Sequence, residues 1–145
     1  MTAPGLVSCG YQSHTAESLV ERLLDRRVGL LADVRLTPMS RTRGLAKKAL
    51  AAHLSGAGIE YVHLPSLGNP KENRAGFAKG DPQAELRYLA LLEREPALQD
   101  MDWLARLARG SVVAVMCFER QEEHCHRRVL LKEMAARDVV LLPPI

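Results

Sequence analysis

The sequence predicts an α/β fold: a single-domain three-layer sandwich with a mainly parallel sheet of about five strands and helices on both faces. The first observation is the length, because 145 residues suit one domain with one core. The second is the alternation of strand-like and helix-like segments, which implies crossover connections between parallel strands. The third is the composition, 47% hydrophobic and 26% charged residues, which is that of an ordinary globular protein. We therefore expect residues 1–145 to form a single α/β domain.

The first half of the chain alternates three short apolar runs with two helix patterns. The runs are 6–10, 30–34 and 59–64, each of strand length and each followed by polar or turn-forming residues. Thr15 is placed to cap the first helix, whose apolar side chains recur on one face. The second helix is expected over about residues 45–54. This half therefore predicts the order strand, helix, strand, helix, strand.

The second half begins with a segment that has no apolar period. Residues 66–82 are rich in Gly, Pro, Asn and Lys, which predicts a long irregular loop, and compact domains rarely keep such a loop without a use. Two helices separated by Pro96 follow. The β-branched run 111–118 predicts a central strand, 125–136 a helix, and 139–142 a last strand.

Charge and cysteine usage narrow the function classes. The 20 basic and 17 acidic residues leave a net charge of +3, too little by itself to indicate a nucleic-acid binder. No apolar run approaches the roughly 18 residues that a membrane-spanning helix needs. Three cysteines do not make a full disulfide framework, and the amino terminus lacks the pattern of an export signal. We expect a cytoplasmic protein that does not enter a membrane.

Polar and reactive side chains follow the predicted strands at the point where each strand ends. Ligands of open α/β sheets bind beyond the carboxyl ends of the strands, so these side chains are the candidate site. They are Tyr11 after the first strand, Asp33, Arg35, Ser40 and Arg41 after the second, Pro65 after the third, and Cys117, Glu119, Cys125, His126 and Arg127 around the turn after the fourth.

The segment Cys125–Arg127 opens the last long helix of the prediction. Free amide groups and the helix dipole favour bound anions at a helix start, and they also lower the pKa of a thiol held there. Arg127 adds a bidentate partner for phosphate or carboxylate, and Arg35 and Arg41 can approach from the neighbouring loop. This pattern predicts a site for a small anionic ligand, with no cofactor.

Several of these residues have a structural interpretation as well as a functional one. Cys117 is either a reactive thiol or a small apolar residue that ends a buried strand. Asp33 either moves protons or forms a structural ion pair with an arginine such as Arg35. Ser40 fits a turn or a helix cap as well as a ligand contact. Cys125, beside histidines at a helix start, favours function.

Five elements in order resemble a bacterial family, domain of unknown function 488: Gly10-Tyr11; Asp33-Val-Arg35; Pro38-Met-Ser-Arg41; Tyr61-Val-His-Leu-Pro65 with Leu67-Gly68; and Cys117-Phe-Glu119 with Cys125-His-Arg127. The resemblance covers nearly the whole chain. It implies an α/β fold and a shared site, without an established reaction, and it extends the substrate-binding candidates to Tyr61 and Gly68. Asn69 stands where the family often has Gly, and Asn tolerates the positive φ that such a position favours.

The leading hypothesis is an enzyme, such as a Cys-dependent hydrolase or transferase, that acts on a nucleotide or phosphorylated compound. Cys117 or Cys125 is the expected nucleophile or redox thiol, and Glu119, Asp33 or His126 is expected to move protons.

Two other classes remain open. The stretch Arg35–Lys48 with Arg127-Arg128 fits a nucleic-acid-associated module that holds phosphates, although 4% aromatic residues leave little for base stacking. Alternatively, Cys117 and Cys125 form a redox switch, which requires their Cα atoms within about 7 Å.

Zinc ligation is the remaining interpretation of the histidines and cysteines. His14, His63, His124 and His126 accompany the two late cysteines, and thiolate and imidazole are the ligands that zinc prefers. No Cys-x2-Cys pair is present, and adjacent residues on a helix diverge by about 100°, which separates Cys125 from His126. On this ground no metal is expected.

Overall fold

The computed structural model describes residues 3–40, 43–119 and 125–145, and it shows a five-stranded parallel sheet. The strand order is β3-β2-β4-β1-β5, which places β2, β4 and β1 in the interior of the sheet, with β4 in the middle. The strands are β1 Gly5–Gly10, β2 Leu30–Asp33, β3 Glu60–His63, β4 Val112–Cys117 and β5 Leu141–Leu142. The predicted α/β class, the parallel sheet and the central fourth strand are therefore confirmed.

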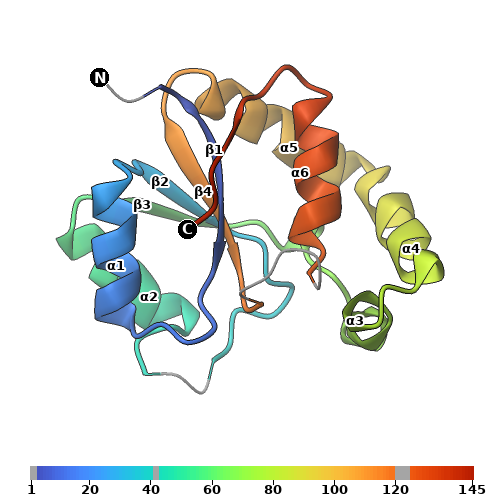
Figure 1. The fold of residues 1–145 in the computed structure, drawn as a ribbon, viewed down its shortest axis with the longest axis horizontal. Helices are drawn as coiled ribbons and strands as arrows, with labels where there is room; N and C mark the ends of the chain where they lie inside the picture. The colour runs from blue at the N-terminus through green and yellow to red at the C-terminus, as the bar shows by residue number, and fades with distance from the viewer. Residues whose placement is uncertain (1–2, 41–42, 120–124) are drawn as a thin grey trace.

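Helices cover both faces of this sheet, so the fold has three layers (Figure 1). Helices α1 (Ala16–Asp25) and α2 (Lys47–Gly56) lie together on one face. The opposite face is covered by α5 (Glu95–Ala108) and α6 (Arg127–Ala135), with the 3-10 helix η1 (Pro65–Leu67), α3 (Lys71–Ala78) and α4 (Pro82–Leu92) extending that layer outward.

The side chains of each strand alternate between the two cores. In β4, Val113 and Val115 join the core under α5 and α6, whereas Val112 and Ala114 join the core under α1 and α2. Cys117 follows the first set and therefore faces α6. This period of two is why a run that is apolar throughout forms a strand buried on both faces.

The segment that lacks an apolar period is the main departure from the expected fold. Instead of a long irregular loop, residues 66–82 contain most of η1 and the whole of α3. Pro65 starts the 3-10 turn and Pro70 precedes α3, in which Asn73 and Phe77 are buried. An eight-residue helix with only these buried positions is too short to show a periodic pattern.

Smaller differences concern element boundaries. Pro96 lies in the first turn of α5, where its missing N–H costs nothing, so the break between α4 and α5 falls before it. Helix α6 begins at Arg127, so Cys125 and His126 precede it. Thr15 caps α1 as expected, in a capping box that pairs Thr15 with Ser18.

No helix in the described ranges has the length and apolar character needed to cross a membrane.

The chain order brings the loops after β2 and β4 into one crevice. These strands are neighbours in the sheet, but the loop after β2 leads to α2 on one face, whereas the chain after β4 leads to α6 on the other. Loops that leave in opposite directions open a crevice at the carboxyl edge, which is where ligands of open α/β sheets bind.

Candidate functional site

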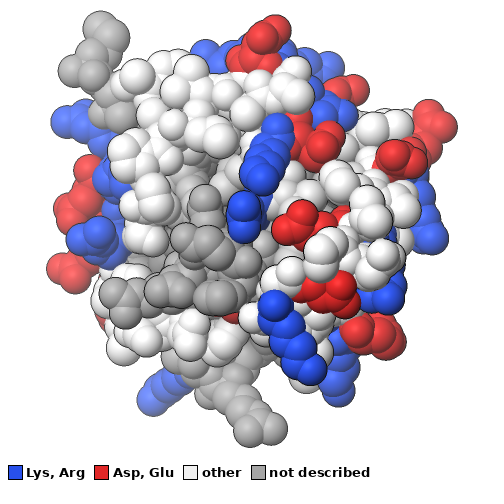
Figure 2. All heavy atoms as spheres, turned by 45° about the vertical axis from the view of Figure 1, so that its right-hand side comes forward, with Lys and Arg blue, Asp and Glu red and all other residues white. Residues whose placement is uncertain are grey.

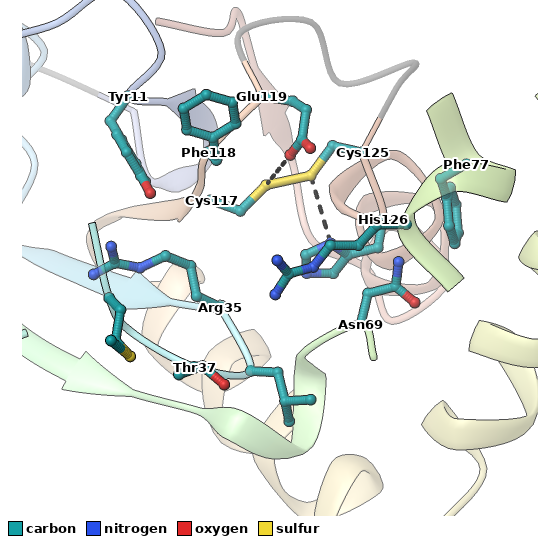
Figure 3. Close-up of a pocket in the computed structure, with 13 residues that line it drawn as sticks. Tyr11, Arg35, Thr37, Asn69, Phe77, Cys117, Phe118, Glu119, Cys125 and His126 are labelled. Atoms are coloured by element: carbon teal, nitrogen blue, oxygen red, sulfur yellow. Dashed lines mark hydrogen bonds between the residues drawn. A yellow bond between two sulfur atoms is a disulfide. The ribbon is translucent and has the colours of Figure 1, made fainter. Parts of the chain in front are cut away.

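A cavity of about 170 Å³ lies in this crevice, at the carboxyl ends of β1, β2 and β4 (Figure 3). It is bounded by the loop after β2, the end of β4, the residues just before α6, and one side of α3. The lining residues are Tyr11, Arg35, Leu36, Thr37, Met39, Asn69, Arg74, Phe77, Cys117, Phe118, Glu119, Cys125 and His126. The segments that follow the second and fourth strands therefore meet.

Arg35 is the most firmly held cation in this cavity wall. Its Nε and one terminal nitrogen donate to the two carboxylate oxygens of Asp33, at 2.8 and 2.7 Å, and the other terminal nitrogen donates to the carbonyl of Leu45 at 2.8 Å. Burial alone disfavours the charge on Arg35, but the hydrogen bonds and charge of Asp33 outweigh it and raise its pKa. A permanently charged guanidinium is thus fixed in one orientation.

Asp33 itself is fully buried and does not line the cavity. It also accepts a hydrogen bond from the Tyr61 hydroxyl at 2.6 Å. Burial and this carboxylate together raise the pKa of Tyr61, which therefore stays a neutral donor. Of the two interpretations of Asp33, the geometry matches the structural ion pair, with Tyr61 as its support.

Tyr11 lines the cavity beside Arg35. The guanidinium carbon lies 5.2 Å from the centre of the Tyr11 ring, and the ring of Phe118 meets Tyr11 edge to face at 5.3 Å. The aromatic ring therefore adds a cation–π contact to the ion pair that orients Arg35.

Cys117 and Cys125 bring their sulfur atoms together in the cavity wall, where they are joined as a disulfide. The Cα atoms are 7.8 Å apart, slightly more than the limit expected for such a pair, but the side chains point toward each other (Figure 3). A carboxylate oxygen of Glu119 lies 3.8 Å from the Cys117 sulfur. Two sulfur atoms and a carboxylate thus share one wall.

His126 presents a defined ring nitrogen to these sulfurs. Its Nε2 lies 2.9 Å from the backbone carbonyl of Val34, an acceptor, so Nε2 carries the proton. Nδ1 is then the atom with the lone pair, and it lies 3.5 Å from the Cys125 sulfur. Burial lowers the pKa of His126 to about 4, with the positive charges of Arg127 and Arg74 acting in the same direction. The imidazole is therefore neutral at pH 7.

Cys117, Cys125 and His126 also form a cluster of metal-ligating type. Their ligand atoms all lie within 4.8 Å of one another. Adjacent residues on a helix point in different directions, but Cys125 and His126 precede α6, so this divergence does not separate their side chains. His124, which sequence analysis grouped with them, lies outside the described residues.

Arg127 is placed away from the cavity, in contrast to the anion-binding role expected for it. Its side chain is only 1% exposed; it donates to the Ser8 hydroxyl at 3.0 Å and to the backbone carbonyl of Glu119. These contacts tie the start of α6 to β1 and to the end of β4. Arg127 therefore positions the segment that carries Glu119 instead of lining the cavity.

The remaining candidates that the structure describes are not part of the cavity wall. Ser40 is half-buried outside the lining, and Arg41 lies outside the described residues. Pro65 and Gly68 line a separate groove on the other side of Leu36. A Cβ added to Gly68 would lie 2.5 Å from the Cα of Leu36, so Gly68 allows the loop after β2 to pack closely.

Three polar residues of the cavity wall were not among the candidates predicted from the sequence. Thr37 follows Arg35 in the same loop, and the side chain of Asn69 is buried, accepting a hydrogen bond from Asn73 at 3.0 Å. Arg74 is exposed on α3 and adds a second guanidinium. The only signal for Arg74 was that residues 66–82 were expected to have a use.

Two arginines of the basic clusters are buried in the described part of the chain. Arg35 and Arg127 are 5% and 1% exposed, so neither presents its charge to a long polyanion. On the face drawn in Figure 2, Lys and Arg are interspersed with Asp and Glu. This arrangement weakens the nucleic-acid interpretation, which needs a basic groove or stripe.

Comparison with known proteins identifies a family but no named relative. The family model described as "Domain of unknown function DUF488" matches residues 15–134. No curated protein and no solved structure matches this chain.

Proposed function

The chain belongs to the family described as domain of unknown function DUF488, and from the chemistry of its site we propose an enzyme that acts on a small anionic substrate. A nucleotide or another phosphorylated compound is the class that fits best. The observation that carries the proposal is the fixed guanidinium of Arg35, in the same cavity wall as the sulfurs of Cys117 and Cys125.

Two guanidinium groups give the cavity its preference for anions. Arg35 approaches from the loop after β2 and Arg74 from α3, while Thr37 and Asn69 add polar contacts. Guanidinium groups bind phosphate and carboxylate with paired hydrogen bonds. Since Asp33 already holds Arg35 in place, little side-chain entropy is lost when a ligand binds.

The reacting groups of the proposal are the sulfurs of Cys117 and Cys125 in the reduced state. A thiolate acts either as a nucleophile or as a metal ligand, and nearby arginines favour that ionised form. Glu119 is the proton carrier closest to them, because its carboxylate lies 3.8 Å from the Cys117 sulfur. Asp33 acts through Arg35 as a positioning residue. A cytoplasmic, bacterial location is part of the proposal, since that compartment keeps thiols reduced.

The test is thermal unfolding of the reduced protein with a panel of phosphate, sulfate, sugar phosphates and nucleotides. A ligand at 100 times its Kd adds about 2.7 kcal/mol of stability and raises Tm accordingly. Arg74→Gln, a change at an exposed residue, is expected to weaken that ligand about tenfold or more. Arg106→Gln is the matched control, because Arg106 is exposed on α5 away from the cavity.

Arg35→Gln is expected to abolish the shift, but it leaves Asp33 unpaired, so its folding is checked first by circular dichroism. The proposal is wrong if no anion of the panel shifts Tm, or if the shift survives both changes in the cavity wall.

The bonded sulfurs favour a second candidate function, a thiol–disulfide switch between Cys117 and Cys125. Reversible formation of the disulfide would switch the activity off and on, because a disulfide has no thiolate that could react. Mass spectrometry after mild oxidation is expected to find a peptide pair linking these two residues, with Cys9 free. Two unmodified thiols after that treatment would rule the switch out.

A further inference from the structure

The cluster of Cys117, Cys125 and His126 carries an inference that anion binding alone does not require. We propose that, once the disulfide is reduced, these three side chains bind a single Zn²⁺ whose fourth position faces the cavity. The inference deepens the proposed function and rests on the same cavity, but it gives the thiolates the role of metal ligands instead of nucleophiles.

The distance between the Cys125 sulfur and the His126 Nδ1 fits tetrahedral zinc. With Zn–S of about 2.3 Å and Zn–N of about 2.0–2.1 Å, sulfur and nitrogen ligands of one ion lie roughly 3.5–3.6 Å apart. The Cys125 sulfur and the His126 Nδ1 are 3.5 Å apart, and all three ligand atoms lie within 4.8 Å of one another. The Cα atoms of the two cysteines are 7.8 Å apart, whereas disulfides usually span about 4.4–6.8 Å. Two sulfurs on one zinc lie about 3.8 Å apart and suit the longer span.

The imidazole is prepared for this role by its second nitrogen. Metal-bound histidines usually donate the other ring N–H to a carbonyl or carboxylate, which fixes the ring and its tautomer. In His126 that contact is the hydrogen bond from Nε2 to the carbonyl of Val34 at 2.9 Å. Nδ1 is thus left with its lone pair directed at the sulfurs. The edge-to-face ring of Tyr88, 5.1 Å away, restricts the imidazole further.

The ligand set is of the catalytic type. Three protein ligands leave one tetrahedral position for water or substrate, and Cys₂His is one of the sets known for catalytic zinc. Glu119, 3.8 Å from the Cys117 sulfur, is outside the three-residue cluster and lines the same cavity. A water bound at that position would share the cavity with Glu119 and with the anion held by Arg35.

Zinc binding to the reduced protein involves no change of oxidation state, so it needs no oxidant. A phosphine and one water molecule first reduce the disulfide: the water supplies the two thiol hydrogens and the oxygen of the phosphine oxide. Zn²⁺ then displaces the thiol protons, so two thiolates neutralise the dication and protons are released to the buffer. The oxidised protein has no thiolate to offer and is expected not to bind.

The full chain is first reduced with a phosphine, and the phosphine is then removed under anaerobic conditions. The reduced protein is titrated with Zn²⁺ in competition with a chromophoric chelator. One equivalent per chain is expected, with a rise in Tm as zinc is added. Co²⁺ in place of zinc is expected to show sulfur-to-metal charge-transfer absorption. Replacing a residue that only supports a metal ligand typically weakens metal binding by about 10- to 100-fold. Cys117→Ser and Cys125→Ser each remove a ligand and are expected to weaken zinc binding by more than that.

Two control variants separate ligand loss from general damage. Cys9→Ala removes the buried thiol that faces the other core and is expected to keep full binding. Arg106→Gln, a change at an exposed residue of α5 away from the cavity, is likewise expected to keep full binding. Reduced, folded wild-type protein that takes up no zinc overturns the proposal, and so does equal uptake by the oxidised form. These titrations contain no anion, so their failure leaves the test of Arg35 and Arg74 untouched.

Discussion

Asp33 and Arg35 form a bidentate ion pair inside the protein, with side chains that are 0% and 5% exposed. The two residues point to the same side of the chain at the end of β2. The carboxylate of Asp33 also accepts a hydrogen bond from the Tyr61 hydroxyl. The site thus depends on a contact that lies behind the cavity wall. Changes at Asp33 should therefore affect stability and ligand binding together.

Asp33→Asn is expected to lower the free energy of unfolding by about 3–5 kcal/mol, because it leaves the buried Arg35 without its charged partner. Urea denaturation followed by circular dichroism measures the loss. Asp102→Asn is the matched control: Asp102 pairs with Arg137 at 3.3 Å but is 69% exposed, so about 0–1 kcal/mol is expected there. Equal effects of the two changes would contradict the role given to the buried pair.

Gly68→Ala is expected to destabilise the protein by about 1–3 kcal/mol, because the added Cβ would meet the backbone of Leu36 at 2.5 Å. The displaced loop carries Arg35 and Thr37, so anion binding should weaken as well. Gly56→Ala provides the contrast. Gly56 ends α2 with open space around it, so the same change is expected to be neutral or to add up to about 1 kcal/mol. Thermal unfolding of the two variants distinguishes a packing effect from loss of glycine as such.

Tyr88→Phe tests how the 3-10 helix before α3 is held. The hydroxyl of Tyr88 is fully buried and donates to the carbonyl of Leu67 at 2.7 Å. Its removal leaves a buried acceptor without this donor and is expected to cost about 1–3 kcal/mol. Chemical denaturation gives the number. A cost near zero would show that the Leu67 carbonyl finds another donor.

His126 predicts a pH dependence of stability in the oxidised, metal-free protein. Its folded-state pKa of about 4 lies below the unfolded value of about 6.5, mainly because of burial, with Arg127 and Arg74 nearby. Between those two pH values the imidazole is protonated in the unfolded chain but not in the folded chain. Stability is therefore unaffected by this group above pH 6.5 and falls as pH decreases toward 4.

The measurement is urea denaturation at several pH values for wild type and for His126→Gln. Carboxylates titrate in both proteins, so the informative quantity is the difference between the two slopes. The variant is expected to lose less stability between about pH 6.5 and pH 4. Parallel curves would mean that the imidazole is protonated as easily in the folded state as in the unfolded one.

Local pattern was enough to predict the architecture and part of the site. The β-branched run at 111–118, the apolar run at 30–34 and the cap at Thr15 each reflect interactions within a few residues, and these carry over to β4, β2 and α1. Placement of Arg35 and Cys117 at one edge followed from the rule for parallel sheets. The match of the family model over residues 15–134 confirms the resemblance seen in the motifs.

Contacts between distant segments decided the rest. Whether Arg127 faces the cavity or Ser8 depends on how α6 packs against β1, across 119 residues of sequence. The tautomer of His126 depends on Val34, 92 residues away. Arg74 enters the site because α3, a helix too short to show periodicity, packs against α4 and forms one side of the cavity. Local patterns report which residues are buried and which are charged, but which charges meet is determined by packing between segments that the sequence separates.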